Sequence, residues 1–191
     1  IIRHALNVAK LEWGWEVPIE LFQNVKLPKL QSKAVRRIPD DDLKLLLQAA
    51  TDHNNIYLKP IIQFALETGM RRGELLSLQW KDIDHDRKMI TVDHTKNGYP
   101  RFIEITKPMN RILKNLVIKN EYVFPLSMNS LRLSYKRLCN KLGIKIRFHD
   151  FRHEAISRLF EQNLSIPHIA SISGHRTMSQ LFRYAHYKGL I

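Results

Sequence analysis

Residues 148–158 read Phe-His-Asp-Phe-Arg-His-Glu-Ala-Ile-Ser-Arg, and we predict a helix over about 150–162. His149 and Arg152 are three residues apart, so both side chains lie on one side of the first helical turn and can reach the same ligand oxygen. The pair is a candidate phosphate clamp. His149 and His153 could bind a metal instead, but neither an acidic third ligand nor a His-Glu-x-x-His spacing accompanies them. Polar residues on a solvated helix stay the simplest alternative until other groups converge.

A second candidate clamp lies upstream in the stretch Thr68-Gly69-Met70-Arg71-Arg72-Gly73-Glu74-Leu75. Gly69 ends one predicted helix, and Arg71 opens the next. The planar fork of an arginine side chain matches two phosphate oxygens, and a helix N-terminus adds positive potential. The alternative is a surface arginine paired with Glu74 three residues later, which is the simpler interpretation for this stretch alone.

Three further residues become informative beside these two clamps. His175 directly follows Gly174, just past a predicted helix, and Tyr184 comes nine residues later in an Arg-Tyr-Ala-His sequence. A tyrosine in such a place usually serves as half-buried packing. Lys96 lies in a Thr-Lys-Asn-Gly sequence at a predicted hairpin tip, where a lysine is ordinarily a solvated turn residue.

The rest of the chain predicts a mainly α fold with a small antiparallel β-sheet insertion. Alternating apolar residues indicate strands at 89–92 and 101–105, joined by the hairpin. Asp40, directly after Pro39, can cap a helix. No internal repeat or low-complexity stretch is present. We predict helices over 1–15, from Asp40 through Leu47, and over 58–68, 71–78, 108–118, 128–142, 150–162, 166–172 and 177–185.

The composition favours a polyanionic partner, with nucleic acid first. The 191 residues suffice for one well-buried domain with a short appendage. They include 31 Lys and Arg against 18 Asp and Glu, for a formal charge of +13, which attracts polyanions. From Arg132 to Arg158, eight basic residues stand against two acids. Solvated helix faces explain that run as well as a DNA-facing surface does.

The cysteine content and the hydropathy of the sequence indicate the cellular compartment to expect. Cys139 is the only cysteine, so no intramolecular disulfide can form, and a reducing compartment such as the cytoplasm is expected. No apolar run approaches the roughly 18 residues that span a bilayer, and the first residues do not resemble a signal peptide.

Three segments are expected along the chain. Residues 1–16 are predicted to form a helix that belongs to another domain. Residues 17–38 contain prolines and a basic cluster, which is typical of an extended linker. Residues 39–191 then form the main domain.

In order and spacing, the motifs resemble those of the tyrosine recombinase family, also called phage-type integrases, over about residues 39–186. The Thr-Gly-Met-Arg stretch resembles the first arginine motif of the family, the hairpin lysine its β-strand lysine, and residues 148–158 its His-x-x-Arg box. The Gly-His pair and the tyrosine resemble the last two motifs. The sequences around residues 148–158 and 172–176 are most similar to those of integrases and shufflon-type DNA invertases. The resemblance implies six catalytic residues: Arg71, Lys96, His149, Arg152, His175 and Tyr184.

The resemblance further implies a site-specific recombinase that integrates, excises or inverts DNA. It would join a strand to Tyr184 as a 3′-phosphotyrosyl ester and then religate it, without ATP, metal or another cofactor. During attack, negative charge accumulates on the non-bridging oxygens of the phosphate. Arg71 and Arg152 can balance this charge, with His175 as a further hydrogen-bond donor and Glu74 in a supporting role.

Two proton transfers accompany this chemistry. Tyrosine has an ordinary pKa of about 10, so its proton needs an acceptor during attack at neutral pH. We assign that role to His149. We assign protonation of the leaving 5′-oxygen to Lys96.

The implied partners are double-stranded DNA and further copies of the chain, as a tetramer on DNA, together with accessory DNA-bending proteins. Residues 1–16 would be the last helix of an N-terminal core-binding domain. Contacts to phosphates make binding sensitive to salt, whereas contacts to bases and the shape of the DNA set the choice of sequence. The basic residues expected to face DNA are Lys33, Arg36, Arg37, Arg132, Lys136, Arg147 and Arg176.

Three other functions fit parts of the sequence. A DNA-binding regulator would keep the charge but lack some of the six residues. A type IB topoisomerase would relax DNA without a target site. A metal-dependent nuclease would use His149 and His153, and EDTA would inhibit it. Because the sequence starts without Met and continues for only seven residues after Tyr184, we expect a fragment that is largely monomeric, binds DNA modestly and recombines poorly alone.

Overall fold

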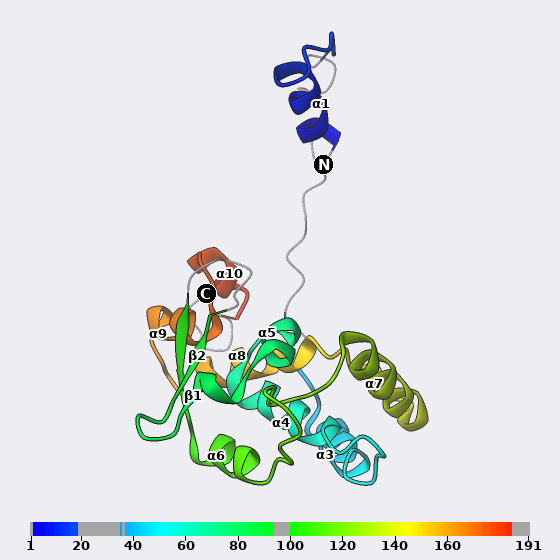
Figure 1. Cartoon of the computed structure of the whole chain (residues 1–191), viewed down its shortest axis with the longest axis vertical. Coiled ribbons are helices and arrows are strands. Elements are labelled where there is room, and N and C mark those ends of the chain that lie inside the picture. The colour runs from blue at the N-terminus through cyan, green and yellow to red at the C-terminus, as the bar shows by residue number, and fades with distance from the viewer. Residues whose placement is uncertain (1, 19–34, 36, 94–99, 185–191) are drawn as a thin grey trace. The chain divides into compact units, whose positions relative to one another are not determined.

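The computed structural model describes residues 2–18, 35, 37–93 and 100–184 (Figure 1). Its contacts divide the chain into two units, Ile1–Ser32 and Lys33–Ile191. The first unit contains α1 (Ile2–Leu11), which is shorter than the predicted helix, and an edge-to-face pair of Trp13 and Trp15. Along the described part of the chain, no helix is long and apolar enough to cross a membrane. The domain boundaries expected at residues 16 and 38 stay predictions.

The second unit is mainly helical with a small antiparallel sheet, which confirms the predicted fold class. The bounds of α7 agree with the prediction, whereas α6 and α10 are shorter than predicted. A 3₁₀ turn at Trp80–Asp82 was not predicted. The described helices of this unit are α3 (Asp40–Ala49), α4 (Leu58–Thr68), α5 (Arg72–Ser77), α6 (Lys107–Lys114), α7 (Met128–Leu142), α8 (Asp150–Glu161), α9 (Ile166–Ser173) and α10 (Met178–Phe182).

The start of α3 differs from the prediction. Asp40 is the first helical residue rather than the cap, Pro39 holds the N-cap position, and no side chain caps the helix. Three acidic residues in the first turn favour the helix in another way, because negative charge is stabilised near the positive end of the helix dipole. They are Asp40, Asp41 and Asp42.

The sheet has the order β1 (Ile83–Asp84), β2 (Met89–Val92) and β3 (Arg101–Glu104), with antiparallel pairing throughout. Ile90 pairs with Ile103, and both are buried. Along β3, buried and exposed residues alternate, so Arg101 shares the buried face with Ile103. The two residues of β1 were too few to be predicted from periodicity. Lys96, in the connection between β2 and β3, lies outside the described residues.

Helix α4 is central to the larger hydrophobic core. Ile61, Ile62 and Phe64 are fully inaccessible to solvent, and the helix packs against α8 and α6. Phe64 meets Phe124 edge to face with 5.5 Å between ring centroids. Full burial of a side chain of this size stabilises a fold by about 1.5–3 kcal/mol. The core thereby fixes α4 and α8 relative to each other.

Helix α8 joins this core to a smaller one. Its residue Phe151 belongs to the larger core, whereas Ile156 and Phe160 pack in the smaller core with side chains of α9 and α10. Helix α9 also contacts β3. Arg152 and His153 therefore lie on a helix that is held by packing at both ends.

Two glycines turn the chain at the ends of helices that border the site. Gly69 ends α4 with φ 62°, as predicted, and Gly174 ends α9 with φ 68°. Both angles are in the left-handed region, which glycine adopts without a steric penalty. The turns bring the chain directly to Arg71 and His175.

Candidate active site

A pocket of about 230 Å³ brings together five of the six residues that the sequence predicted. The sixth, Lys96, is outside the described residues. The pocket is formed by the start of α5, the first turns of α8 and the chain from His175 onward. The side chains that line it are Arg71, His149, Arg152, His153, His175, Gln180, Arg183 and Tyr184.

Arg71 is held at the N-cap of α5 by Glu74. The backbone N–H and the Nη1 group of Arg71 both donate to the Glu74 carboxylate, each at 2.8 Å. Its Nη2 group donates to the carbonyl of Gly174 at 3.2 Å. The ion pair considered as the simpler interpretation of the sequence is thus present, and Arg71 still lines the pocket.

Arg152 is almost fully buried, with 4% of its surface exposed. Its Nη1 group donates to the carbonyl of Gly69 at 2.6 Å, and its Nη2 group donates to the carbonyl of Ser173 at 2.7 Å. Burial, together with the nearby charge of Arg71, lowers the pKa of Arg152 to about 10. The guanidinium is therefore still protonated at neutral pH. Because carbonyl groups carry no full negative charge, the cation stays available to an anionic ligand.

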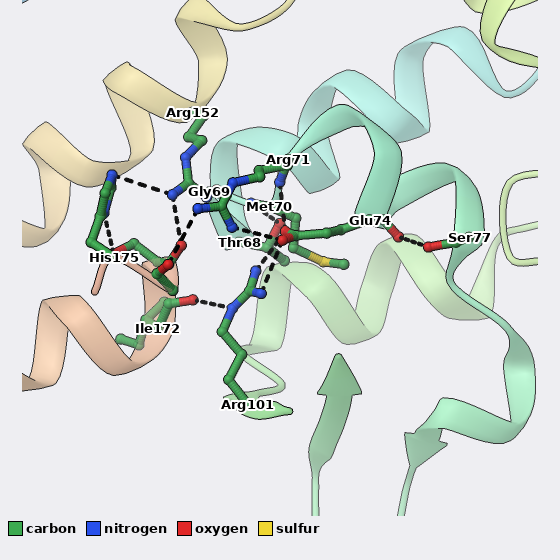
Figure 2. Close-up of polar contacts among 12 residues, drawn as sticks. Thr68, Gly69, Met70, Arg71, Glu74, Ser77, Arg101, Arg152, Ile172 and His175 are labelled. Atoms are coloured by element: carbon green, nitrogen blue, oxygen red, sulfur yellow. Dashed lines mark hydrogen bonds and ion pairs between the residues drawn. The ribbon is translucent and has the colours of Figure 1, made fainter. Parts of the chain in front are cut away.

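Glu74 has a second arginine partner that sequence reasoning missed. Nη1 and Nη2 of Arg101 donate to the two carboxylate oxygens of Glu74 at 3.1 and 2.7 Å (Figure 2). Burial by itself would raise the pKa of Glu74, but its hydrogen bonds and charge interactions with the two arginines bring that pKa below its ordinary value. The only available sequence signal was the period of two in the predicted strand at 101–105, which puts Arg101 on the same face as the apolar Ile103 but does not identify Glu74.

The contacts of His175 determine which of its nitrogens carries the proton. The Ser173 hydroxyl donates to the carbonyl of Ile169 at 2.6 Å, so it must accept from Nδ1–H of His175, which lies 2.8 Å away. Nε2 then carries a lone pair, 3.4 Å from Nη2 of Arg152. Neutral His175 consequently presents an acceptor beside Arg152, and the predicted donor role requires protonation or a turn of the ring.

Tyr184 is 1% exposed and belongs to the smaller core. Its ring stacks on Phe160 with 6.0 Å between centroids. Its hydroxyl lies 2.5 Å from Nδ1 of His153, a residue that the sequence suggested only as a metal ligand. The ring of His149, the predicted proton acceptor, is edge-on to His153 with 4.8 Å between centroids. His153 is therefore the imidazole in contact with the phenol.

A metal site at His149 and His153 would need a third ligand close to both side chains. Among the residues that the structure describes, no group of three His, Cys, Asp or Glu side chains lies close enough to hold a metal ion. His149 and His153 instead meet through their rings.

The predicted DNA-facing residues are distributed over several surroundings. Arg132, Lys136 and Arg147 line a pocket of about 610 Å³ beside α7. Arg147 also pairs with Asp150 at 2.9 Å. Arg176 is exposed next to His175. The positions Lys33 and Arg36 are outside the described residues.

Arg37 forms ion pairs within the fold, and its predicted contact with DNA stays a prediction. Its Nε group donates to Glu154 at 2.9 Å, and its Nη1 group pairs with Glu161. Both carboxylates belong to α8. These contacts attach the chain before α3 to the helix that carries Arg152.

Comparison with known sequences gives one family and several relatives. The sequence profile of the phage integrase family matches residues 36–189. A shufflon-specific DNA recombinase of Escherichia coli is 34% identical over 98% of this chain and 49% of its own length. Tyrosine recombinase XerA of Saccharolobus solfataricus is 29% identical over 84% of this chain and 55% of its own length. The chain thus spans about half the length of these curated relatives.

Solved structures show the same fold at lower identity. A lambda integrase dimer bound to a COC′ core site has a TM-score of 0.74 and 21% identity, covering 100% of this chain and 59% of that one. The catalytic domain of bacteriophage HP1 integrase has a TM-score of 0.67 and 24% identity, covering 80% of this chain and 88% of that one.

The histidines of the pocket predict how stability depends on pH. Burial, with the nearby charges of His149 and Arg183, lowers the pKa of His153 to about 4, and burial beside Arg152 lowers that of His175 to about 3. An unfolded histidine titrates near 6.5. Between about pH 4 and 6.5 the unfolded chain therefore binds more protons, so the free energy of unfolding rises with pH in that window. Urea titrations across the window measure this slope.

Replacing one of these histidines should reduce the slope. His153→Phe removes one titrating group from the pocket, and we expect a shallower rise of the free energy of unfolding. His85→Asn, which removes an imidazole from an exposed turn outside the pocket, is the matched control. An unaltered slope in His153→Phe would mean that this imidazole titrates in the folded chain as it does in the unfolded one.

Proposed function

Because the chain belongs to the phage integrase family, we propose that it is the catalytic part of a site-specific DNA recombinase. It breaks and rejoins DNA strands through a 3′-phosphotyrosyl link on Tyr184, in integration, excision or inversion. The observation that carries the proposal is the single pocket that Arg71, Arg152 and Tyr184 line together. In this proposal residues 39–191 are the catalytic domain, and residues 1–16 are the last helix of a core-binding domain.

In the proposed reaction, the scissile phosphate occupies the pocket between the two arginines. The Tyr184 hydroxyl oxygen attacks phosphorus, and the bond to the 5′-oxygen breaks. Charge on the non-bridging oxygens grows along this path, and preorganised cations stabilise it without rearrangement. The buried Arg152, protonated at neutral pH, and Arg71 supply that charge. The phosphotyrosyl ester retains the bond for religation by a second 5′-hydroxyl, so no ATP is consumed.

The phenolic proton of Tyr184 passes to His153 in this proposal. The 2.5 Å contact between the hydroxyl and Nδ1 supports the assignment over His149, because an acceptor must lie within hydrogen-bond distance. The lowered pKa of His153 keeps its imidazole neutral, so that Nδ1 can accept. A bound phosphate adds negative charge beside the ring and favours its protonated form. His149 lies edge-on to this acceptor.

The remaining roles concern the phosphate and the leaving oxygen. Once the phosphate charge has raised the pKa of His175, its Nε2 can carry a proton and donate to a non-bridging oxygen. Lys96 remains the proposed donor to the 5′-oxygen, on the resemblance of its motif alone.

The proposed partners are double-stranded DNA and further copies of the chain assembled on it, in the cytoplasm. The relatives with solved structures include integrase dimers and tetramers bound to DNA, which supports both partners. The basic side chains around the pocket beside α7 are the proposed contacts to phosphates or bases. Accessory DNA-bending proteins are a further proposed partner.

A covalent adduct tests the proposal directly. We expect the protein, incubated in EDTA with a nicked suicide duplex that carries a candidate target site, to form a protein–DNA adduct on a denaturing gel. Tyr184→Phe should abolish the adduct, because it lacks the nucleophilic oxygen, and should still bind the duplex. An adduct that persists in Tyr184→Phe would place the nucleophile elsewhere. Tight binding of the duplex by the wild type without any adduct would favour a DNA-binding regulator.

The choice of proton acceptor is tested by comparing two histidines. At neutral pH, His153→Ala should slow adduct formation by about 10²-fold, the lower range for loss of a general base. Raising the pH toward 9 should recover much of this loss, because hydroxide then removes the phenolic proton. His149→Ala is the matched variant and should lack that recovery. Recovery confined to His149→Ala would return the acceptor role to His149.

The basic pocket beside α7 predicts a salt effect on DNA binding. Each lost phosphate contact lowers the slope of log affinity against log salt by about 1. Replacing both Arg132 and Lys136 by alanine should therefore lower the slope by about 2 in fluorescence anisotropy titrations. Lys44→Ala on α3, exposed and paired with Asp41 at 3.8 Å, is the control. A double variant with the slope of the wild type would remove these residues from the phosphate contacts.

A further inference from the structure

Arg71 is in a position that poses an electrostatic problem. Its Nη1 group is 2.8 Å from the Glu74 carboxylate. A lone ion pair of this kind is close to neutral at a distance, so the carboxylate would cancel most of the attraction that Arg71 exerts on a phosphate. Glu74 cannot simply be removed, because it also fixes the backbone N–H of Arg71.

Arg101 removes this cancellation. It forms a two-pronged ion pair with Glu74, in which its side chain is 7% and that of Glu74 3% exposed. Paired geometry of this type is strong and directional, and the pair is screened little by solvent. With Arg101 included, the cluster of Arg71, Glu74 and Arg101 has a net charge of +1 rather than zero.

Arg101 also contacts the end of α9. Three consecutive carbonyl groups there each accept from a different arginine: Ile172 from Nε of Arg101 at 2.9 Å, Ser173 from Arg152 at 2.7 Å, and Gly174 from Arg71 at 3.2 Å. Figure 2 shows the arginines arranged around this helix end. The last carbonyls of a helix carry the negative end of its dipole, so they stabilise nearby cations.

Gly174, the last of these three residues, lies close to the side chain of Arg101. A Cβ atom at Gly174 would lie 3.2 Å from Cδ and Nη1 of Arg101. The φ of 68° at Gly174 also disfavours any other residue. A side chain at this position would therefore crowd the guanidinium of Arg101.

We propose that Arg101 is a positioning residue of the active site. As the counter-ion of Glu74, it allows that carboxylate to orient Arg71 without neutralising it, and it fixes the end of α9 that holds Arg71 and Arg152 and leads to His175. This inference rests on the proposed phosphate chemistry of the pocket, but it makes its own prediction about charge.

The test is a double-substitution cycle with Glu74. We expect Arg101→Met to slow single-turnover adduct formation by roughly tenfold or more, with a smaller change in DNA affinity, because the transition state depends on the preorganised cations. Adding Glu74→Gln should recover part of the rate, because a neutral amide can still accept from Arg71 but no longer cancels its charge. A double variant that is as slow as Arg101→Met, or slower, would overturn the proposal.

A conservative variant and a surface control complete the design. Arg101→Lys keeps the charge but loses the two-pronged geometry and the bond to Ile172, so its rate should lie between the wild type and Arg101→Met. Arg87→Met, in an exposed pair with Asp84 at 3.7 Å, should behave as the wild type. Thermal denaturation identifies variants that do not fold. If Arg101→Met is one of them, the same cycle is measured with Arg101→Gln, which also removes the charge, and the same recovery by Glu74→Gln is required.

Binding of inorganic phosphate separates this proposal from the proposed function. In titration calorimetry, Arg101→Met should weaken phosphate binding by roughly tenfold, and Glu74→Gln should restore part of it, independently of Tyr184. If the wild type forms no adduct, but Arg101→Met weakens phosphate binding and Glu74→Gln restores part of it, only the tyrosine chemistry is refuted. A normal adduct in the wild type with no effect of Arg101→Met on either measurement would refute only the role of Arg101.

Discussion

The mutual repulsion of buried like charges is the constraint on which the rest of the site depends. Arg71, Arg101 and Arg152 lie close together, and two of them are almost fully buried. Isolated cations in such surroundings would cost several kcal/mol each. One carboxylate and the carbonyl groups at the ends of α4 and α9 stabilise them, and these acceptors together carry less negative charge than the arginines carry positive. The net positive charge that remains attracts an anionic ligand.

Helix packing keeps these acceptors in place. Helix α8 reaches from the larger core to the smaller one and carries Arg152 and His153 between them. Helices α4 and α9 end against it, each at a glycine with left-handed geometry. The positions of the polar groups thus follow from burial of apolar side chains that have no chemical role, and a small shift of either helix end would separate an arginine from its acceptor.

The sequence was sufficient for the fold class, and residues chosen from motifs of fixed order, such as Arg71, Arg152 and Tyr184, line one pocket. It was not sufficient for contacts made across the fold. Arg101 reaches Glu74 over 27 positions of sequence, and nothing local to β3 indicates that partner. The sequence suggested His153 only as a metal ligand. Which of His149 and His153 contacts the hydroxyl of Tyr184 depends on how α10, which precedes Tyr184, packs against α9. Short elements such as β1 have too few residues for a periodic signal.

Tyr184 is buried in the smaller core, so in the proposed function one side chain serves both folding and reactivity. Its ring packs in the hydrophobic interior, and only its hydroxyl oxygen would take part in the proposed chemistry. An evolving lineage could therefore lose catalysis through a change of one oxygen and keep an intact DNA-binding scaffold. Replacement of the tyrosine by another nucleophile is more restricted, because the new side chain must also fill the volume of an aromatic ring beside Phe160. Descendants that have lost catalysis should thus be easier to reach than descendants with a different nucleophile.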